Sequence, residues 1–387
     1  HSFTLLNRIG KRVGAFRCRQ SVTEFTLRHP ELEEQIEYIL REWQPHLVHV
    51  NHLLGFTPSI LALARNSGAR TLITLHDYYM ICDSWNLLDE QHAFCGINQF
   101  FDERCNSCCT SRRPQFSLVE PIRRRVAMSE ALAYAQAVIV PSHAAEQQLR
   151  AVFPHLPATH VIAPVFDQSI MPLKHGEGDE LIVLIPGNLS INKGYFDLRS
   201  IIEQSNDIGL PVQFRVLGRV ESWIEQELAS IPNVKLLGRY DSQSFARKAS
   251  GCDLAFFLSP WPETYCITFD EWKLGGRPCF YYATGALAEV HRQDGLHPAS
   301  KSFAVGDLDA LICALTLAST SAGVQHLRQP ITEIREPNQN TGFGSKHWSL
   351  FRQLLITPMN LSEIQLSPSQ YHKWVDDHAV SSVLTAR

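Results

Sequence analysis

The stretch Ser259-Pro-Trp-Pro-Glu263-Thr-Tyr-Cys-Ile-Thr-Phe-Asp-Glu271-Trp-Lys-Leu-Gly-Gly276-Arg-Pro278 is the most informative part of the chain. The apolar run Asp253–Leu258 leads into it and predicts a buried strand. The prolines that follow predict a stiff turn, and the paired glycines before Pro278 predict the end of a helix. Strand, turn and helix in this order form one unit of a parallel sheet.

Two acidic residues flank the start of this helix, because Glu263 precedes it and Glu271 lies about two turns further on. Free N–H groups at a helix start, with the helix dipole, attract phosphate and sugar oxygens. The residues expected to offer such groups beside Glu263 are Thr264, Tyr265, Cys266 and Ile267. By itself, a pair of glutamates at this spacing is also typical of a solvated helix face.

The same alternation of strand and helix recurs along the chain. Continuous apolar runs predict strands buried on both faces. These runs are His46–Val50, Thr71–Leu75, Ala137–Val140, Leu181–Ile185, Val212–Leu217, Val234–Leu237, Leu254–Leu258 and Cys279–Tyr282. Amphipathic segments such as Leu32–Trp43 and Ala144–Phe153 lie between them. The pattern predicts an α/β fold of doubly wound parallel sheets, with a ligand crevice beyond the carboxyl ends of the strands.

The length of 387 residues predicts two domains and a tail. The proline- and glycine-containing stretch Pro164–Asp179 is the expected boundary. We therefore predict domains at residues 1–165 and 166–345, followed by a helix and a tail or linker at 346–387. Within that last part, Ser369–Asp377 is expected to form an aromatic helix.

Composition excludes several classes of protein. Lys and Arg number 35 against 39 Asp and Glu, so the net charge of −4 provides no basic field for nucleic acid. No apolar run approaches the ~18 residues of a membrane span, and no signal peptide opens the chain. Because the chain begins at His1 rather than Met, we expect it to be part of a longer, multi-domain chain.

The segment from Glu263 to Glu271 resembles the Glu-x7-Glu signature of retaining glycosyltransferases of family 4, which have the GT-B fold of two Rossmann-like domains facing each other across a cleft. Further segments resemble motifs of that family in the same order along residues 45–295. They are His46–Gly55, Thr74–Tyr78, Val138–Ser142, Leu184–Gly194 and Ala283–Glu289.

This resemblance implies roles for individual residues. The N-terminal domain would bind the acceptor and the C-terminal domain the nucleotide-sugar donor. Glu263 would accept hydrogen bonds from the donor sugar, Glu271 would bind the ribose, and Lys193 would neutralise the departing diphosphate. His76 would approach the transferred sugar from the opposite domain, and His52 is the other histidine placed to face the cleft. His76 and Glu263 are thus the catalytic candidates, although His76 could instead cap the following turn.

The donor loop departs from the family pattern. It begins with Gly187, and Asn188 stands where the family usually has Arg, so Lys193 is the remaining cation. Arg219 and Arg239 are the candidates to replace the missing charge. The glycine-rich loop that opens the family's N-terminal domain is absent, and we expect it to precede His1.

The implied activity is transfer of a hexose from a nucleoside diphosphate sugar to a saccharide or lipid-linked saccharide, with retention and without a catalytic metal. The implied setting is O-antigen or capsule assembly in the cytoplasm, with the protein peripheral to the inner membrane. A nucleotide-sugar epimerase and a non-catalytic binding or scaffold module are the alternatives. A dehydrogenase is disfavoured because no Gly-x-Gly-x-x-Gly follows a strand.

Cysteines gather in the loop 82–113 that follows the predicted strand end at His76. Cys82, Cys95, Cys105 and Cys108 offer four thiolates, and the last two have the spacing of zinc knuckles. Either a structural zinc orders this loop, or the cysteines are free and buried. Four thiolates leave no open position for a catalytic zinc. Nearby, Arg123–Arg125 is interpreted as a solvated helix face, with contact to a membrane surface or an acceptor phosphate as the alternative.

Overall fold

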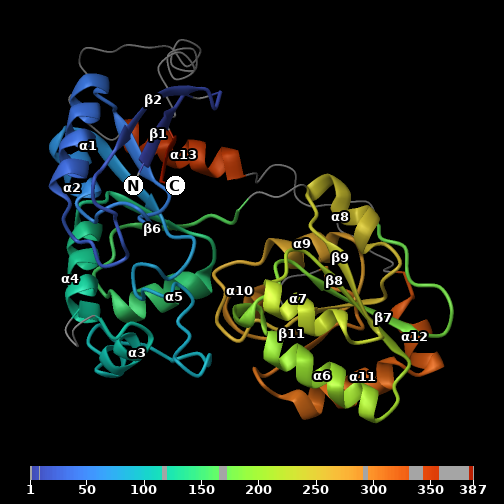
Figure 1. Cartoon of the computed structure of the whole chain (residues 1–387). Helices are drawn as coiled ribbons and strands as arrows, with labels where there is room; N and C mark the ends of the chain where they lie inside the picture. Colours follow the sequence, from blue (N-terminus) through green and yellow to red (C-terminus); the bar gives the residue numbers. More distant parts are fainter. Residues whose placement is uncertain are drawn as a thin grey trace.

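The computed structural model describes residues 2–7, 9–115, 120–164, 172–290, 295–330, 343–356 and 383–386. Two α/β domains lie side by side in Figure 1, and each contains a parallel sheet with helices against it. The predicted α/β class with doubly wound parallel sheets is therefore confirmed. The expected aromatic helix at Ser369–Asp377 lies outside the described residues.

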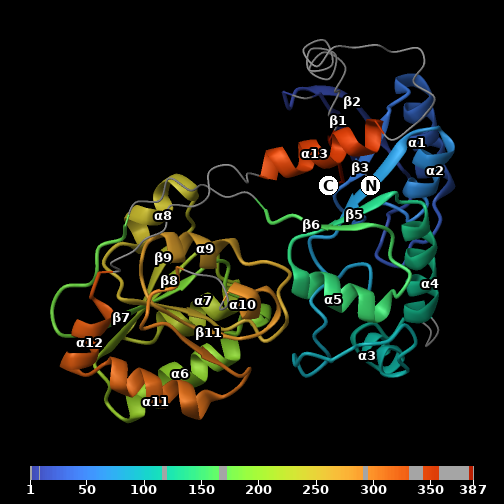
Figure 2. The same cartoon turned by 180° about the vertical axis from the view of Figure 1, so that it is seen from behind.

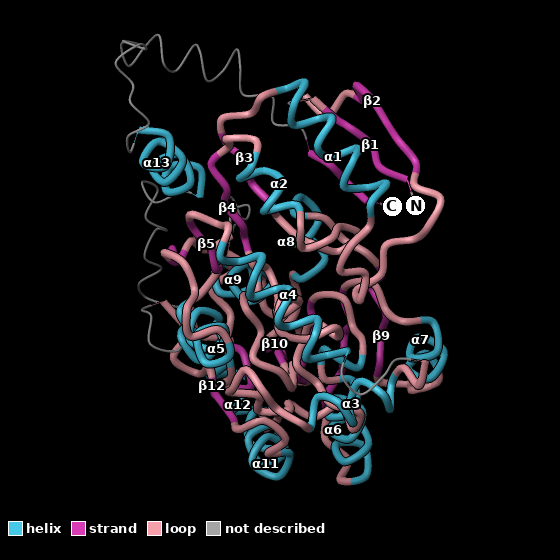
Figure 3. The backbone as a smooth tube through the Cα atoms, turned by 90° about the vertical axis from the view of Figure 1, so that its left-hand side faces the viewer, coloured by secondary structure: helices cyan, strands magenta, loops and turns pink. Residues whose placement is uncertain are grey.

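The N-terminal domain is built on a four-stranded parallel sheet in the order β3-β4-β5-β6. Its strands are β3 (Leu47–Val50), β4 (Arg70–Thr74), β5 (Ala137–Val140) and β6 (Thr159–Val161). The helices are α1 (Pro30–Trp43), α2 (Ile60–Asn66), α3 (Arg104–Arg112), α4 (Glu120–Ala133) and α5 (His143–Val152). Helices α1, α2 and α4 lie in front of the sheet in Figure 3.

Local signals explain where two of these helices begin. The His29 ring accepts a hydrogen bond from the amide of Leu32 and thereby caps α1, whose first residue, Pro30, already has a helical φ. The Ser142 hydroxyl caps α5 in the same way, by accepting from the amide of Ala145. The α5 cap lies directly after β5, so the sequence Pro141-Ser142 fixes a helix start at the carboxyl end of a central strand.

A separate antiparallel sheet joins the two ends of the described chain. Strand β1 (Ser2–Leu6) pairs with β2 (Arg12–Arg17) on one side and with β13 (Val383–Ala386) on the other. Phe3 of β1 is fully buried, and its ring stacks on Phe16 at 4.7 Å between centroids.

The C-terminal domain contains a six-stranded parallel sheet in the order β12-β11-β10-β7-β8-β9. Its strands are β7 (Leu181–Pro186), β8 (Val212–Leu217), β9 (Val234–Gly238), β10 (Leu254–Phe257), β11 (Cys279–Tyr282) and β12 (Lys301–Phe303). Its helices are α6 (Tyr195–Asp207), α7 (Ser222–Ala229), α8 (Ser242–Ala249), α9 (Ile267–Leu274), α10 (Gly285–Val290), α11 (Leu308–Ala318) and α12 (Ser321–Leu327). Every residue of β7, β10 and β11 is buried, as the continuous apolar runs predicted.

After the second domain the chain returns to the first. Helix α13 (Phe343–Ile356) lies beside β3 and β5 of the N-terminal domain in Figure 2. Leu350 of α13 packs in one buried cluster with Leu72, Ile139 and Ile162. The alternate residues of β5, Val138 and Val140, face the cluster that includes α1 and α5. Helix α13 therefore covers the second face of the first sheet.

No single helix in the described ranges is both long and apolar enough to cross a membrane. The pair α11 and α12 meets the length and composition criteria only when the two helices are joined, and they are bent by 94°.

Candidate functional site

The candidate site lies where loops from the two domains touch. The loop after β10 (Ser259–Cys266, hereafter the β10 loop) faces the segment after β4 that carries His76 and Tyr78. The Thr264 hydroxyl donates to the backbone carbonyl of His76, and the Tyr78 hydroxyl donates to the carbonyl of Pro262 at 2.9 Å. Tyr78 is fully buried. The predicted donor and acceptor sides therefore meet directly at His76.

Glu263 and Lys193 form an ion pair in this site. Their Oε2 and Nζ atoms are 2.6 Å apart, and the Ser259 hydroxyl donates to the other carboxylate oxygen. The Glu263 side chain is 5% exposed and that of Lys193 is 39% exposed. Burial lowers the pKa of Lys193, but the adjacent Glu263 carboxylate outweighs it and the net pKa is raised. Lys193 therefore stays charged at neutral pH beside the Glu263 side chain.

Two glycines allow the backbone to approach the β10 loop closely. Gly194 follows Lys193 with a φ of +80°, and a Cβ atom on it would lie 2.0 Å from the carbonyl oxygen of Leu258. Gly285 has a φ of +54°, and its Cβ atom would lie 2.5 Å from the carbonyl oxygen of Glu263. Only glycine has access both to positive φ and to this spacing. The two glycines thereby position the ion pair.

Helix α9 begins at Ile267, with Cys266 as its N-cap, which is later than predicted. The residues before it are held by other contacts: the Glu263 amide donates to the Trp261 carbonyl, and the Ala286 amide donates to the Glu263 carbonyl. These bonds hold Glu263 in a loop, so the helix does not start directly after it. Of the four residues predicted to offer amides at the helix start, only Ile267 belongs to the helix.

The side chains of the predicted helix-start residues have other partners. The Thr264 hydroxyl is engaged with His76, and the Tyr265 hydroxyl donates to the Asp270 carboxylate. Burial raises the pKa of the Cys266 thiol to about 12, so this thiol is neutral. These residues shape the loop through their side chains.

Glu271 is 5% exposed on α9, so its carboxylate does not extend into bulk water. Tyr240, which follows β9, lies near it: burial raises the pKa of the Tyr240 hydroxyl, and the charge of Glu271 adds to that rise. A buried carboxylate of this kind needs polar partners.

The donor-loop residues Gly187 and Asn188 pack against the loop after β8. The side-chain oxygen of Asn188 accepts from the Arg219 amide at 3.1 Å. Asn188 therefore joins two strand ends, which gives this departure from the family pattern a structural role. The side chains of Arg219 and Arg239 are exposed, and within the described part of the chain neither guanidinium has a hydrogen-bond partner.

His76 is exposed at the site. Partial burial is the largest influence on its pKa and lowers it; the nearby His52 lowers it further, while Asp77 acts in the opposite direction. The His52 Nε2 atom lies 3.1 Å from Asp77 Oδ2. His76 is thus neutral at pH 7 and able to exchange hydrogen bonds with a sugar hydroxyl.

A second contact between the domains was not assigned from sequence. Glu289 of α10 accepts hydrogen bonds from the amides of His143 and Ala144 at the N-terminus of α5. A carboxylate in this position is favoured by the dipole of α5. Beside this contact a cavity of about 790 Å³ opens between α5, β6, α10 and α13. The segment Ala283–Glu289 had matched a family motif, but the residues alone did not reveal a partner in the other domain.

The four predicted zinc ligands, Cys82, Cys95, Cys105 and Cys108, line one cavity of about 280 Å³. All are free cysteines. Burial raises the pKa of the Cys95 thiol to about 11 and that of the Cys108 thiol to about 12.

The arginine run beside this cavity is not a solvated face, and this prediction is wrong for two of its members. Arg124 and Arg125 are both 2% exposed. Arg124 donates to the carbonyls of Glu24 and Tyr79, and Arg125 donates to those of Ile81 and Phe100. Loop carbonyls far away in the sequence satisfy the guanidinium donors, so burial is tolerated.

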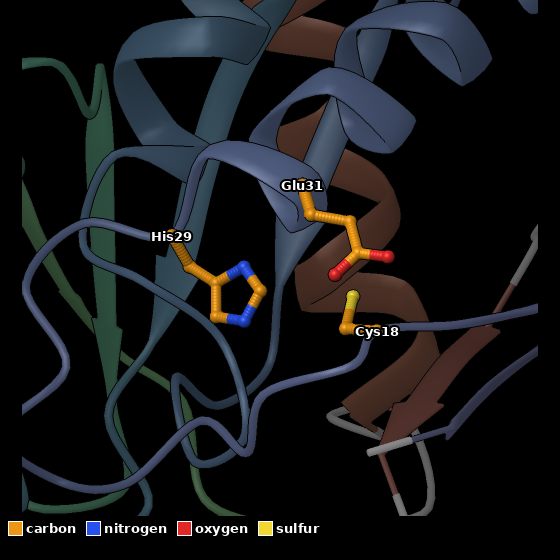
Figure 4. Close-up of side chains that lie close together, drawn as sticks. All are labelled: Cys18, His29 and Glu31. Atoms are coloured by element: carbon orange, nitrogen blue, oxygen red, sulfur yellow. The ribbon is translucent and has the colours of Figure 1, made fainter.

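In the described ranges, one group of possible metal ligands has its ligand atoms within 4.8 Å of one another. It consists of Cys18, His29 and Glu31 (Figure 4). Both ring nitrogens of His29 already have partners: Nδ1 caps α1, and Nε2 lies 3.3 Å from the Gln20 carbonyl. Because a ligating His must free one nitrogen, this cluster fits a helix start better than a metal centre.

Comparisons with known proteins agree with this architecture. Residues 10–164 match the family model for a glycosyl transferase 4-like domain. Among curated proteins, no match to the chain is found.

The similar solved structures include three that each cover more than four fifths of this chain. They are sucrose-phosphate synthase from Thermosynechococcus elongatus (17% identity, TM-score 0.56, covering 86% of this chain and 78% of that one), HepE from Anabaena in complex with UDP (16%, 0.52, 84% and 82%) and the lipopolysaccharide outer core galactosyltransferase WaaB (14%, 0.50, 84% and 80%).

The two domains thus have the GT-B fold, as the resemblance predicted. The family model likens residues 10–164, in the N-terminal domain, to a glycosyl transferase 4-like domain, whereas the similar structures show the fold alone.

Proposed function

We propose that the chain is a retaining glycosyltransferase that moves a hexose from a nucleoside diphosphate sugar to a hydroxyl of a saccharide or lipid-linked saccharide. The observation that carries this proposal is the Lys193–Glu263 pair, held 2.6 Å apart where the β10 loop meets His76. An ammonium beside a carboxylate supplies what such a donor needs, namely a cation for the diphosphate and an acceptor for sugar hydroxyls.

In this reaction the bond between the anomeric carbon and the diphosphate breaks as the acceptor oxygen attacks from the same face. The acceptor proton passes to the departing phosphate oxygen. Lys193 offsets the charge that develops there, with Arg219 and Arg239 as further cations, and no metal ion is assigned to this step. Glu271 binds the ribose, and the neutral His76 orients the sugar across the interface. We assign no residue as a covalent nucleophile.

We further propose a UDP-sugar as donor and surface polysaccharide, such as O-antigen or capsule, as product. Supporting this, HepE was solved with UDP, and WaaB is a galactosyltransferase of the lipopolysaccharide outer core. The proposed location is the cytoplasm, at the periphery of the inner membrane, where lipid-linked acceptors are available.

Thermal unfolding with a panel of nucleoside diphosphates tests donor binding. A ligand at 100 times its Kd adds about 2.7 kcal/mol to the free energy of unfolding, so UDP should raise the melting temperature clearly. Glu271→Gln should remove that rise. Glu225→Gln, at an exposed position of α7, is the matched control and should keep it. If no nucleoside diphosphate changes the melting temperature, the proposal is wrong.

Turnover is tested with UDP-sugars and lipid-linked saccharides, and the anomeric configuration of the product is read by NMR. An α-linked product from an α-linked donor supports retention, whereas a β-linked product refutes it. An epimerised donor formed without acceptor would identify an epimerase. Nucleotide binding without turnover on any acceptor would favour the scaffold alternative.

A further inference from the structure

Four cysteines from separate segments line one cavity. Cys82 lies in the loop after β4, Cys95 lies further along that loop, and Cys105 and Cys108 lie one turn apart on α3. The cavity measures about 280 Å³, and all four residues are partly buried. The sequence spacing alone did not determine whether these thiols would lie together, but the fold gathers them around one space.

Guanidinium groups contact three of the four sulfur atoms. Arg125, which is 2% exposed, donates from Nη2 to Cys105 Sγ at 3.1 Å. Arg112 contacts Cys108 Sγ through Nη1, and its Nη2 lies 4.0 Å from Cys82 Sγ. A charged N–H donor binds a thiolate more strongly than a neutral thiol. Such donors are also the groups that orient thiolate ligands around a metal ion.

The loop between these cysteines has little regular structure to hold it. Between Cys82 and α3, the described backbone contains one isolated bridge, between Leu88 and Phe94. A loop of this length inside a compact domain needs another source of order. Disulfides do not supply it, because each of these cysteines is free.

We propose that Cys82, Cys95, Cys105 and Cys108 bind a structural zinc ion, with Arg112 and Arg125 as hydrogen-bond donors to the ligating sulfurs. Each thiol releases its proton to solvent when it ligates zinc, and the closed tetrathiolate shell leaves no position for substrate. Since no three of these sulfurs lie within 4.8 Å of one another, binding draws them inward.

This zinc ion would act on the candidate site through the chain next to Cys82. The Cys82 amide donates to the Tyr78 carbonyl at 2.9 Å, which closes a turn. The Tyr78 hydroxyl in turn donates to Pro262 of the β10 loop. Fixing Cys82 therefore fixes the segment that contacts the donor side, so the ion positions the site without taking part in the reaction.

The test is the metal content of the full chain, purified after growth with added zinc and measured by inductively coupled plasma mass spectrometry. We expect one zinc ion per chain. Cys95→Ser and Cys108→Ser should each lower zinc affinity by about tenfold or more. The matched control is Cys109→Ser, because Cys109 is the next residue of α3 and is buried but lies outside the ligand set. The control should retain the zinc.

X-ray absorption of the unmodified protein gives a second measurement that does not depend on any variant folding. We expect four sulfur neighbours at about 2.3 Å from zinc. Protein without stoichiometric zinc, iron with sulfide in its place, a disulfide among the four cysteines, or oxygen and nitrogen as the main neighbours would each overturn the proposal. UDP binding is measured separately, so failure of the zinc site and failure of the proposed transferase are distinguishable.

Discussion

Replacing Gly194 by Ala should damage the donor site more than its small size suggests. The new Cβ atom must accept a φ of +80°, which costs an L-residue about 1–2 kcal/mol. It would also lie 2.0 Å from the Leu258 carbonyl oxygen, a backbone atom that cannot rotate away. Overpacking of this kind costs about 1–3 kcal/mol. The two effects together predict a loss of about 2–5 kcal/mol in the free energy of unfolding.

Gly209→Ala is the matched control for this variant. Gly209 also has a positive φ, +67°, but a Cβ atom there would meet nothing within 4 Å. It should therefore lose only about 1–2 kcal/mol. Urea unfolding gives both free energies, and titration calorimetry gives the affinity for UDP, which should fall in Gly194→Ala alone because Lys193 is displaced from Glu263. Equal losses of stability in both variants, with unchanged UDP affinity, would refute the close approach.

Three further predictions concern contacts around the site. Burial, with two nearby histidines, lowers the pKa of His49 to about 4, so the unfolded chain binds a proton at this residue more tightly than the folded chain does. The free energy of unfolding should therefore fall by about 3 kcal/mol as the pH drops from 6.5 to 4. Urea unfolding of His49→Gln should show a weaker dependence of this free energy on pH. Tyr78→Phe removes the hydroxyl that donates to the Pro262 carbonyl, a hydrogen bond worth about 1 kcal/mol. Titration calorimetry should therefore show roughly fivefold weaker UDP binding. An unchanged affinity would show that this contact does not support the donor side. Glu289→Gln removes the carboxylate charge at the start of α5 and so weakens this contact between the domains. Small-angle X-ray scattering of the unliganded protein should then give a larger radius of gyration. An unchanged radius would contradict a role of Glu289 in holding the domains together.

Secondary structure follows the local sequence pattern where that pattern and burial agree. The run Ala137–Val140 became β5 with the predicted bounds because both of its faces are covered, so every position had to be apolar. The same holds for Cys279–Tyr282 in β11. In these segments no distant contact competes with the local signal, and the parallel sheets followed from the pattern.

The errors come from contacts between segments far apart in the chain. Helix α9 starts later than its sequence suggested because the Glu263 carbonyl is already bonded to the amide of Ala286. Arg125 looked solvated because its acceptors, the carbonyls of Ile81 and Phe100, lie 44 and 25 residues away in the sequence. For the same reason, the partner of Glu289 on α5 carried no sequence signal. Spacing within one segment does not encode such pairs, so only the folded chain reveals them.

Helix α13 has a practical consequence for dividing this protein into pieces. A fragment ending at residue 164 would include the whole span matched by the family model and still lack Leu350. Leu72 and Ile139, fully buried beneath that helix, would then be open to water on one side of the sheet. The folding unit is therefore assembled from two distant parts of the polypeptide. A fragment cut by sequence similarity alone would expose an apolar sheet face and would be prone to aggregate.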